Sequence, residues 1–194
     1  MFQHQFGGKV LPLEIKDLDF HFENSPTRIV ANRNHSEIKL AGITIGPLQE
    51  GNEYELHYWI AQELVKAGIA HFREDDCLDA AKLYKIQWRE RVQIAGQISE
   101  LPADFYPKLR RFVANLKEEI AKQPEKIQEY EKARYLTWDI INSRLKKIVA
   151  LSSGPTQTEE VLKKFTGEER LVYEQVSKII NLWKRQIAEL KREG

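Results

Sequence analysis

The sequence has little cysteine and no long apolar run, and each absence excludes a class of protein. Its single cysteine, Cys77, cannot form an internal disulfide, which excludes a small domain held together by such bonds. No run of about 18 apolar residues occurs, so we expect no membrane-spanning helix. The first residues have neither a basic start nor an apolar stretch of secretory length. Together these absences predict a protein of the reducing cytoplasm.

Patterns that would bring catalytic or metal-binding groups together are also missing. Gly7-Gly8-Lys9 lacks the spacing of a phosphate-binding loop, and Ser152-Ser153-Gly154 has no nearby histidine to activate a hydroxyl. The histidines are scattered, without the i, i+4 pairs of zinc-binding helices: His4, His21, His35, His57 and His71. We therefore expect no catalytic residue, no metal and no cofactor, and predict that the protein is not an enzyme.

Charge is nearly balanced overall, at +1, but it is unevenly shared along the chain. Residues 1–78 carry 7 basic and 12 acidic residues, a balance of −5, and residues 79–194 carry 23 and 17, a balance of +6. Two surfaces with different partners would give such a split. A stand-alone nucleic-acid-binding helical module is therefore one candidate, although interspersed glutamates argue against a continuous basic stripe.

The first 50 residues are typical of β structure. Short apolar or alternating runs occur at residues 9–15, 27–31, 37–40 and 41–45, with Gly42 as a possible bulge inside the last. Glycine- and proline-containing turns separate most of these runs. The pattern predicts a small sheet at the start of the chain.

A helix is predicted to follow from about Asn52 to Gly68. Asn52 and Glu55 have the spacing of a capping box, and Gly68 suits a left-handed helix end. A returning strand is expected at residues 69–72. The helix would bury the core of this small domain, for which we predict Leu56, Trp59, Ile60 and Leu64.

The remainder is predicted to be helical, with helices at about residues 79–97, from a cap at Asp104, and at about 125–151. Thr166 and Glu169 form a capping box for the last helix. Its apolar residues recur with a mean spacing of about 3.6, typical of a straight helix packed on a bundle: Val172, Val176, Ile179, Trp183, Ile187 and Leu190. The predicted fold is a small α+β, β-rich domain (residues 1–75) followed by a mainly α-helical bundle domain (residues 76–194).

The helix at residues 133–151 carries three cations within its apolar face. Projected at 100° per residue, its apolar side chains cover an arc of about 220°, wide enough to pack on two sides. Arg134, Arg144 and Lys147 fall inside that arc. They indicate either a subunit interface or an internal ion pair with a neighbouring helix, because an isolated buried cation is very costly. A phosphate-contacting patch at residues 144–147 is a third interpretation.

Three ordered segments resemble the GINS family of replication proteins. Residues 55–61, Glu-Leu-His-Tyr-Trp-Ile-Ala, are similar to the Trp-Leu/Ile-Ala helix of its small domain, although relatives often have proline where this chain has His57. Residues 100–106, Glu-Leu-Pro-Ala-Asp-Phe-Tyr, resemble a Leu-Pro-x-x-Phe/Leu-Tyr helix start. The third segment, residues 134–173, resembles an Arg-x-x-Lys-Ile helix followed by a Thr-x-Glu-Glu helix start. Residues 1–35 are matched poorly.

The resemblance implies an archaeal-type subunit of the two/three class, which has the small domain first, in a heterotetramer with a paralogue that has the helical domain first. It implies a scaffold bridging the MCM helicase and a RecJ-like nuclease relative, with primase or polymerase as further candidate partners and little or no direct DNA contact. It would be nucleoid-associated in an archaeon and nuclear in a eukaryote. We expect the subunit interface to include Leu101, Phe105, Tyr106, Arg134, Trp138, Arg144, Lys147 and Trp183.

Overall fold

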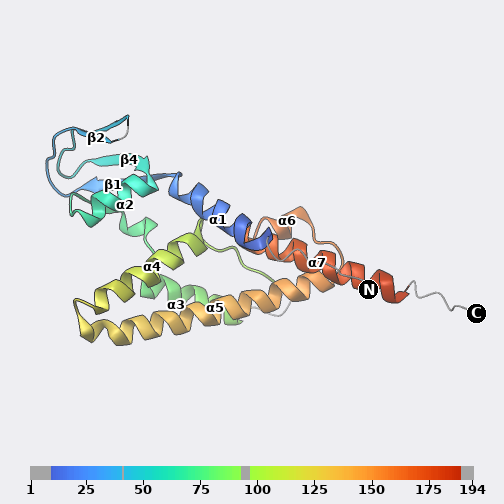
Figure 1. The fold of residues 1–194 in the computed structure, drawn as a ribbon. Helices are drawn as coiled ribbons and strands as arrows, with labels where there is room; N and C mark the ends of the chain where they lie inside the picture. The colour runs from blue at the N-terminus through green and yellow to red at the C-terminus, as the bar shows by residue number, and fades with distance from the viewer. Residues whose placement is uncertain (1–9, 41, 93–96, 189–194) are drawn as a thin grey trace, which may run out of the picture. The chain divides into compact units, whose positions relative to one another are not determined.

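The computed structural model describes residues 10–40, 42–92 and 97–188, and the chain divides into two compact units (Figure 1). One unit is Asp17–Cys77, and the other is Leu78–Gly194 together with Met1–Lys16. The first contains a small antiparallel sheet and the second is mainly helical, which confirms the predicted fold class. Among the described residues, no helix has the length and apolarity needed to cross a membrane.

The strand predicted at residues 9–15 is wrong, because the chain is helical from Val10. Helix α1 spans Val10–Glu23, and Lys9 lies outside the described residues. Pro12 falls in the first turn, where a backbone N–H has no intrahelical acceptor, so proline is tolerated. Asn24 Nδ2 and Ser25 Oγ donate to the carbonyl groups of the last turn, at 2.8 and 2.7 Å, and end the helix.

The small unit is built on a three-stranded antiparallel sheet in the order β4-β1-β5. The central strand β1 (Pro26–Ala31) pairs with β4 (Glu53–His57) on one side and β5 (Ala70–Phe72) on the other. Ile29, fully buried, lies between Tyr54 and Phe72 in this register. Strands β1 and β5 were predicted from short apolar runs at residues 27–31 and 69–72. Their pairing places the core side chains on one face.

A separate hairpin joins β2 (Ile38–Leu40) to β3 (Ile43–Ile45). Leu40 pairs with Ile43, so the chain reverses between them. Gly42 has a φ of 85°, a conformation that glycine adopts without strain. Gly42 therefore belongs to a hairpin turn, and the predicted bulge within one continuous strand is wrong.

The predicted helix start near Asn52 is also wrong, because residues 53–57 form β4 and α2 runs only from Tyr58 to Lys66. Ile60 and Leu64 are buried in the core of the unit, and Leu56 and Trp59 pack against it half-buried. The helix ends as predicted at Gly68, with a φ of 68°. The Gly68 and Ile69 N–H groups donate to the carbonyls of residues 65 and 64, which closes the last turn.

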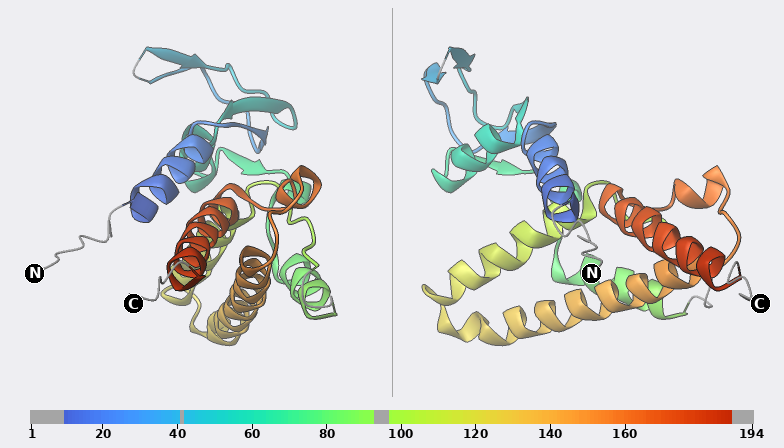
Figure 2. Two further views of the ribbon diagram at one scale, coloured as in Figure 1. Left: turned by 90° about the vertical axis from the view of Figure 1, so that its right-hand side faces the viewer. Right: turned by 45° about the vertical axis from the view of Figure 1, so that its right-hand side comes forward.

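The helical unit contains three long helices that follow α3 (Ala80–Val92): α4 (Phe105–Ile120), α5 (Ile127–Ser153) and α7 (Gly167–Ala188). Short helical turns occur at Pro124–Lys126 and at α6 (Glu159–Leu162). Helix α5 packs against α3 and α7 and lies between them, as Figure 2 shows. The first predicted helix was expected to reach Gln97, but α3 is described only to Val92 and Gln97 is not helical, so this predicted end is wrong. Residues 93–96 lie outside the described residues.

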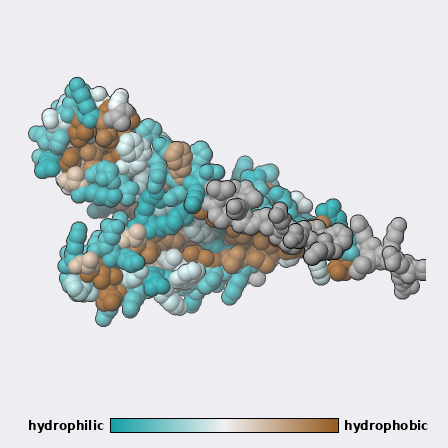
Figure 3. Space-filling view, in the orientation of Figure 1, coloured by the Kyte–Doolittle hydropathy of each residue, from teal (hydrophilic) through white to brown (hydrophobic). Residues whose placement is uncertain are grey.

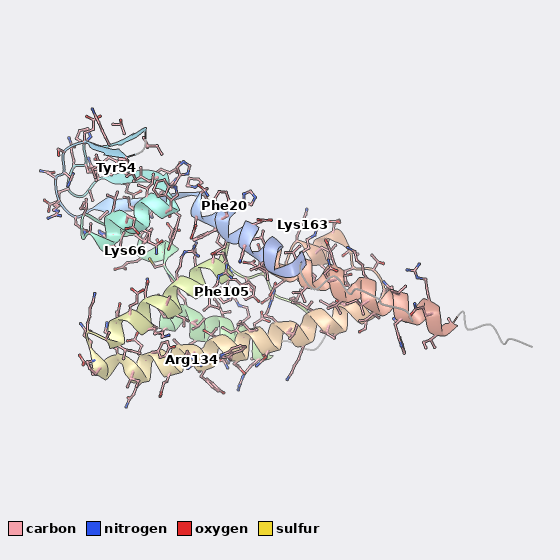
Figure 4. The ribbon with its side chains drawn as sticks, in the orientation of Figure 1. Phe20, Tyr54, Lys66, Phe105, Arg134 and Lys163 are labelled. Atoms are coloured by element: carbon pink, nitrogen blue, oxygen red, sulfur yellow. The ribbon has the colours of Figure 1, made fainter. Side chains whose placement is uncertain are left out.

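Two hydrophobic clusters fill the helical unit. The larger joins α3, α4 and α5 and includes Leu83, Phe105 and Ile140, each less than 2% exposed. Figure 4 labels Phe105 at the start of α4. The smaller cluster includes Phe165 and Tyr173 beside the end of α5. Asp104 precedes α4 with a φ of 55° and makes no side-chain cap, so its predicted capping role is wrong.

Candidate subunit interface

Arg144, on α5, is the centre of a buried network of charges. Its guanidinium donates to Glu169 at the start of α7, from Nε to Oε1 (2.7 Å) and from Nη2 to Oε2 (2.6 Å). Nη1 donates to Glu90 Oε1 on α3 (3.1 Å) and to the carbonyl oxygen of Ser99 (2.6 Å). The rigid fork of guanidinium donors allows one side chain to bridge these segments. Arg144 therefore links α3, α5 and α7 from inside the unit.

Lys147, one turn along α5, balances the second buried carboxylate. Its Nζ donates to Glu90 Oε2 (2.7 Å) and to the Glu90 carbonyl oxygen (2.9 Å). The Ser99 hydroxyl also donates to the Glu90 carboxylate. In the part of the chain that the structure describes, the four buried charges are two cations, Arg144 and Lys147, and two anions, Glu90 and Glu169. Because each charge has an opposite partner, the network avoids the cost of an isolated buried ion.

Glu169 also caps its own helix. Its Oε2 accepts the Thr166 N–H (3.1 Å), and the Glu169 N–H donates to Thr166 Oγ1 (3.3 Å). This confirms the predicted capping box. The Tyr106 hydroxyl, on α4, donates to Glu169 Oε1 (2.8 Å), so the same carboxylate joins three helices of the unit.

The pKa shifts follow from this geometry. Burial alone would raise the pKa of the Glu90 carboxyl, but hydrogen bonds from Lys147 and Ser99 and the charge of Arg144 hold it below its ordinary value. Burial alone would lower the pKa of Arg144, and Glu169 raises it above its ordinary value. Burial and then the charge of Glu169 raise the pKa of the Tyr106 phenol, so its hydroxyl stays protonated and donates.

The structure corrects the assignment of Arg144 and Lys147 to a subunit interface. Both side chains are buried and paired within the chain, so the internal ion pair is the arrangement that forms. The interpretation as a phosphate-contacting patch fails for the same reason. Leu101 and Phe105, at 7% and 1% exposure, belong to the core of the unit and present no side-chain surface to a neighbour.

The other residues assigned to the interface lie nearer the surface. Tyr106 is half-buried and packs against the α3–α4–α5 cluster. Arg134, labelled in Figure 4, is exposed on α5. Its guanidinium carbon lies 5.6 Å from the centre of the Tyr130 ring. Trp138 and Trp183 are 57% and 58% exposed. These two tryptophans, on α5 and α7, are therefore available to another chain.

Helix α7 changes its surroundings along its length. Val172 and Val176 are half-buried against the unit, but the same apolar stripe continues into the exposed residues Ile179, Trp183 and Ile187. Leu190, predicted in the same stripe, lies outside the described residues. The prediction of a helix packed on a bundle therefore holds only for its first half. Hydrophobic residues also reach the surface of the helical unit in Figure 3.

The sequence interpretation missed Glu90, although a signal was present. Glu90 follows Leu83 by seven residues and Ile86 by four, so it falls on the apolar face of α3. An acid in that position needs a buried cation, as the arginine on the apolar arc of α5 needs an anion. It also missed the exposed side chains of Tyr84 and Trp88 on the opposite side of α3, 53% and 60% exposed.

Comparison with known protein families supports a family assignment for the helical unit. A family model described as the GINS complex protein helical bundle domain matches residues 77–188, more than half of the chain. The match covers α3 to α7 and therefore includes the whole buried charge network. A search of curated proteins found no matching sequence.

Proposed function

The chain belongs to the GINS family of DNA replication proteins, and from this premise we propose that it is a non-catalytic scaffold subunit of a GINS complex. In this proposal it pairs with a paralogue whose helical domain comes first, in a heterotetramer of archaeal type. The order of a small sheet-containing part before the helical part supports the two/three class. We also propose that the chain has two functional domains, the small β-rich domain at residues 1–75 and the helical domain at residues 76–194.

The exposed stripe of α7 is the observation that carries the proposal. Its last three turns hold large apolar side chains at 50–60% exposure: Ile179, Leu182, Trp183 and Ile187. Such a stripe is what a helix presents when another element covers it. Since the first half of the stripe packs on its own unit, a helix of a second subunit would continue the same packing over the second half.

The buried charges support a structural role for the helical unit rather than a chemical one. Each of the four has at least one partner of opposite charge within 3.1 Å. General acid–base chemistry needs a group that reaches a substrate proton. Here the carboxylates of Glu90 and Glu169 are buried and accept several hydrogen bonds, so they support fixed helix positions.

We further propose that the assembled complex holds the MCM helicase and a RecJ-like nuclease relative in register, with primase or polymerase as additional contacts. Such a bridge needs separate surfaces for separate partners. The distinct exposed faces of α5 and α7 supply candidate surfaces on the helical unit alone. A soluble site at the nucleoid, or in the nucleus of a eukaryote, would follow from this role.

Co-expression with a helical-domain-first paralogue tests the assembly. The full-length chains should co-purify as a heterotetramer by size exclusion with light scattering, with interfaces larger than about 2,000 Å². Trp183→Glu should break the complex, because it places a charge in the apolar stripe. Ile127→Glu is the matched control, since Ile127 is also exposed, at 48%, but lies at the start of α5. A monomeric wild-type chain, or equal loss in both variants, contradicts the proposal.

The bridging role needs its own test. The assembled wild-type complex should retain purified MCM and the RecJ-like protein together on one affinity resin, each in a fixed ratio. If the heterotetramer forms but captures neither protein, the assembly proposal stands and the bridging proposal is refuted.

A further inference from the structure

Helix α3 presents to solvent a face on which aromatic and cationic side chains lie side by side. Tyr84 and Trp88 are 53% and 60% exposed, and Lys85 and Arg89, the next residue in each case, are exposed as well. Glu90 is the sole acidic residue of Ala80–Val92, and it is buried on the opposite side. The exposed face of α3 therefore carries only positive charge.

The two kinds of side chain form two parallel rows. Residues four apart on an α-helix are separated by about 6 Å along its axis and lie on nearly the same side. Tyr84 and Trp88 form one such row, and Lys85 and Arg89 form the other, about 100° further round the helix. A repeat of this size is comparable to one nucleotide of an extended single strand. Bases could stack on the aromatic row while phosphates lie over the cations.

Helix α5 adds a third aromatic ring at the edge of this face. Arg91 binds Asp139 through two hydrogen bonds, Nε to Oδ2 (2.8 Å) and Nη2 to Oδ1 (2.9 Å), and also donates to the Tyr135 hydroxyl (3.2 Å). Tyr135 is 61% exposed. The pair neutralises Asp139, the carboxylate that reaches α3 from α5. In the described part of the chain, Lys85 and Arg89 form no ion pair, so their charges are free for a ligand.

We infer that the outer face of α3 (Tyr84, Lys85, Trp88, Arg89), bordered by Tyr135, binds single-stranded nucleic acid. The kinds of side chain on this face indicate which ligand it binds. The exposed stripe of α7 is mainly aliphatic and matches a partner helix, whereas the α3 face combines flat rings with unpaired cations, the combination that binds single strands without sequence preference. A second copy of the same face would be repelled by its like charges. The sequence alone predicted little or no direct contact with DNA, so this site is additional to the scaffold role.

The test uses fluorescence anisotropy of a labelled oligothymidylate of about 20 nucleotides, with the full-length chain and with the assembled complex. Trp88→Ala should weaken binding about 5- to 150-fold, the loss expected for one stacked base, and Trp88→Phe should retain most of the affinity. Lys85→Gln with Arg89→Gln should reduce the slope of log affinity against log salt by about 1.4, at about 0.7 per phosphate contact.

Lys117→Gln with Lys122→Gln is the matched control, because it removes the same charge from two exposed positions outside α3, one in the last turn of α4 and one just after that helix. The control should keep both affinity and salt slope, and circular dichroism should show that every variant is folded. Equal losses in the control mean general electrostatic attraction and overturn the proposal. Absence of binding at low salt overturns it too. If Trp88→Ala instead breaks the heterotetramer while wild type binds no strand, α3 is a protein interface, and the scaffold proposal alone survives.

Discussion

Replacing Arg144 with alanine is the most direct perturbation of the helical unit. The substitution removes the donors that reach Glu169, Glu90 and the Ser99 carbonyl, and leaves two carboxylates in a buried space with Lys147 as the remaining cation. Breaking a buried pair by removing one partner typically costs about 3–5 kcal/mol. A domain of this size is stable by only about 5–15 kcal/mol. The variant should therefore lose a large part of its stability before any partner is involved.

The loss of stability caused by Arg144→Ala should depend on pH. The pKa of Glu90 is held below its ordinary value of 4.5 in the folded chain, so its contribution to stability is present above that value and is lost as the pH falls through the folded pKa. Without Arg144, burial acts against the charged carboxylate with less opposition, and its pKa should rise. The difference in stability between wild type and variant should therefore narrow as the pH falls from the raised pKa of the variant to the lowered folded pKa of the wild type.

Urea denaturation of the full-length chain, followed by circular dichroism at neutral and acidic pH, measures both effects. Arg91→Ala is the control, because Arg91 makes the same two-bond contact to a carboxylate, Asp139, but with a 53% exposed side chain. Solvent screens such a pair, so Arg91→Ala should lower the free energy of unfolding far less than Arg144→Ala does. If Arg144→Ala is as mild as Arg91→Ala, or if it abolishes assembly while the free energy of unfolding is unchanged, the internal network is not what holds these helices.

Two further predictions concern the cores and caps. Ile60→Ala should lower the free energy of unfolding by about 2–5 kcal/mol, because Ile60 is buried. Trp59→Ala should lower it by less than the roughly 3–5 kcal/mol that is usual for a buried aromatic residue, because Trp59 is only half-buried. Urea denaturation in which Trp59→Ala is the more destabilising of the two variants would contradict the described core. Thr166→Ala should cost about 0.5–2 kcal/mol through loss of the α7 cap, and Thr166→Ser should restore it in thermal unfolding; no change in either variant would mean that Glu169 alone maintains the helix start.

The helical half could be predicted from local patterns because its signals are local. The Thr166–Glu169 capping box lies within one turn, and the apolar spacing of α5 and α7 extends over several turns. The end of α2 was predictable for the same reason, since Gly68 fixes the left-handed turn by itself. These features need no knowledge of distant residues.

The failures occurred where distant partners decide the structure. Asn52 and Glu55 imitate a capping box, but residues 53–57 alternate in burial and pair with β1, about 25 residues earlier. Glu90 and Glu169 lie 54 and 25 residues from Arg144, so the helical projection could show that the arginine faces inward but not which anion it meets. The same projection placed Leu136 and Trp138 at opposite ends of one wide apolar arc, but it could not show that the Leu136 end is buried and the Trp138 end is exposed.

The shared carboxylate of Glu169 has a geometric consequence for α7. The Glu169 side chain both caps the first turn of α7 and binds Arg144, so the direction of the α7 axis is fixed at the N-terminal end of the helix. The helix has 22 residues and is about 33 Å long, so a tilt of about 10° at the first turn would move the far end by about 6 Å. The position of a neighbouring subunit that packs on the C-terminal turns of α7 would thus depend on an ion pair that this subunit does not contact. Substitution of Arg144 or Glu169 would then misalign the complex without changing any residue of the interface.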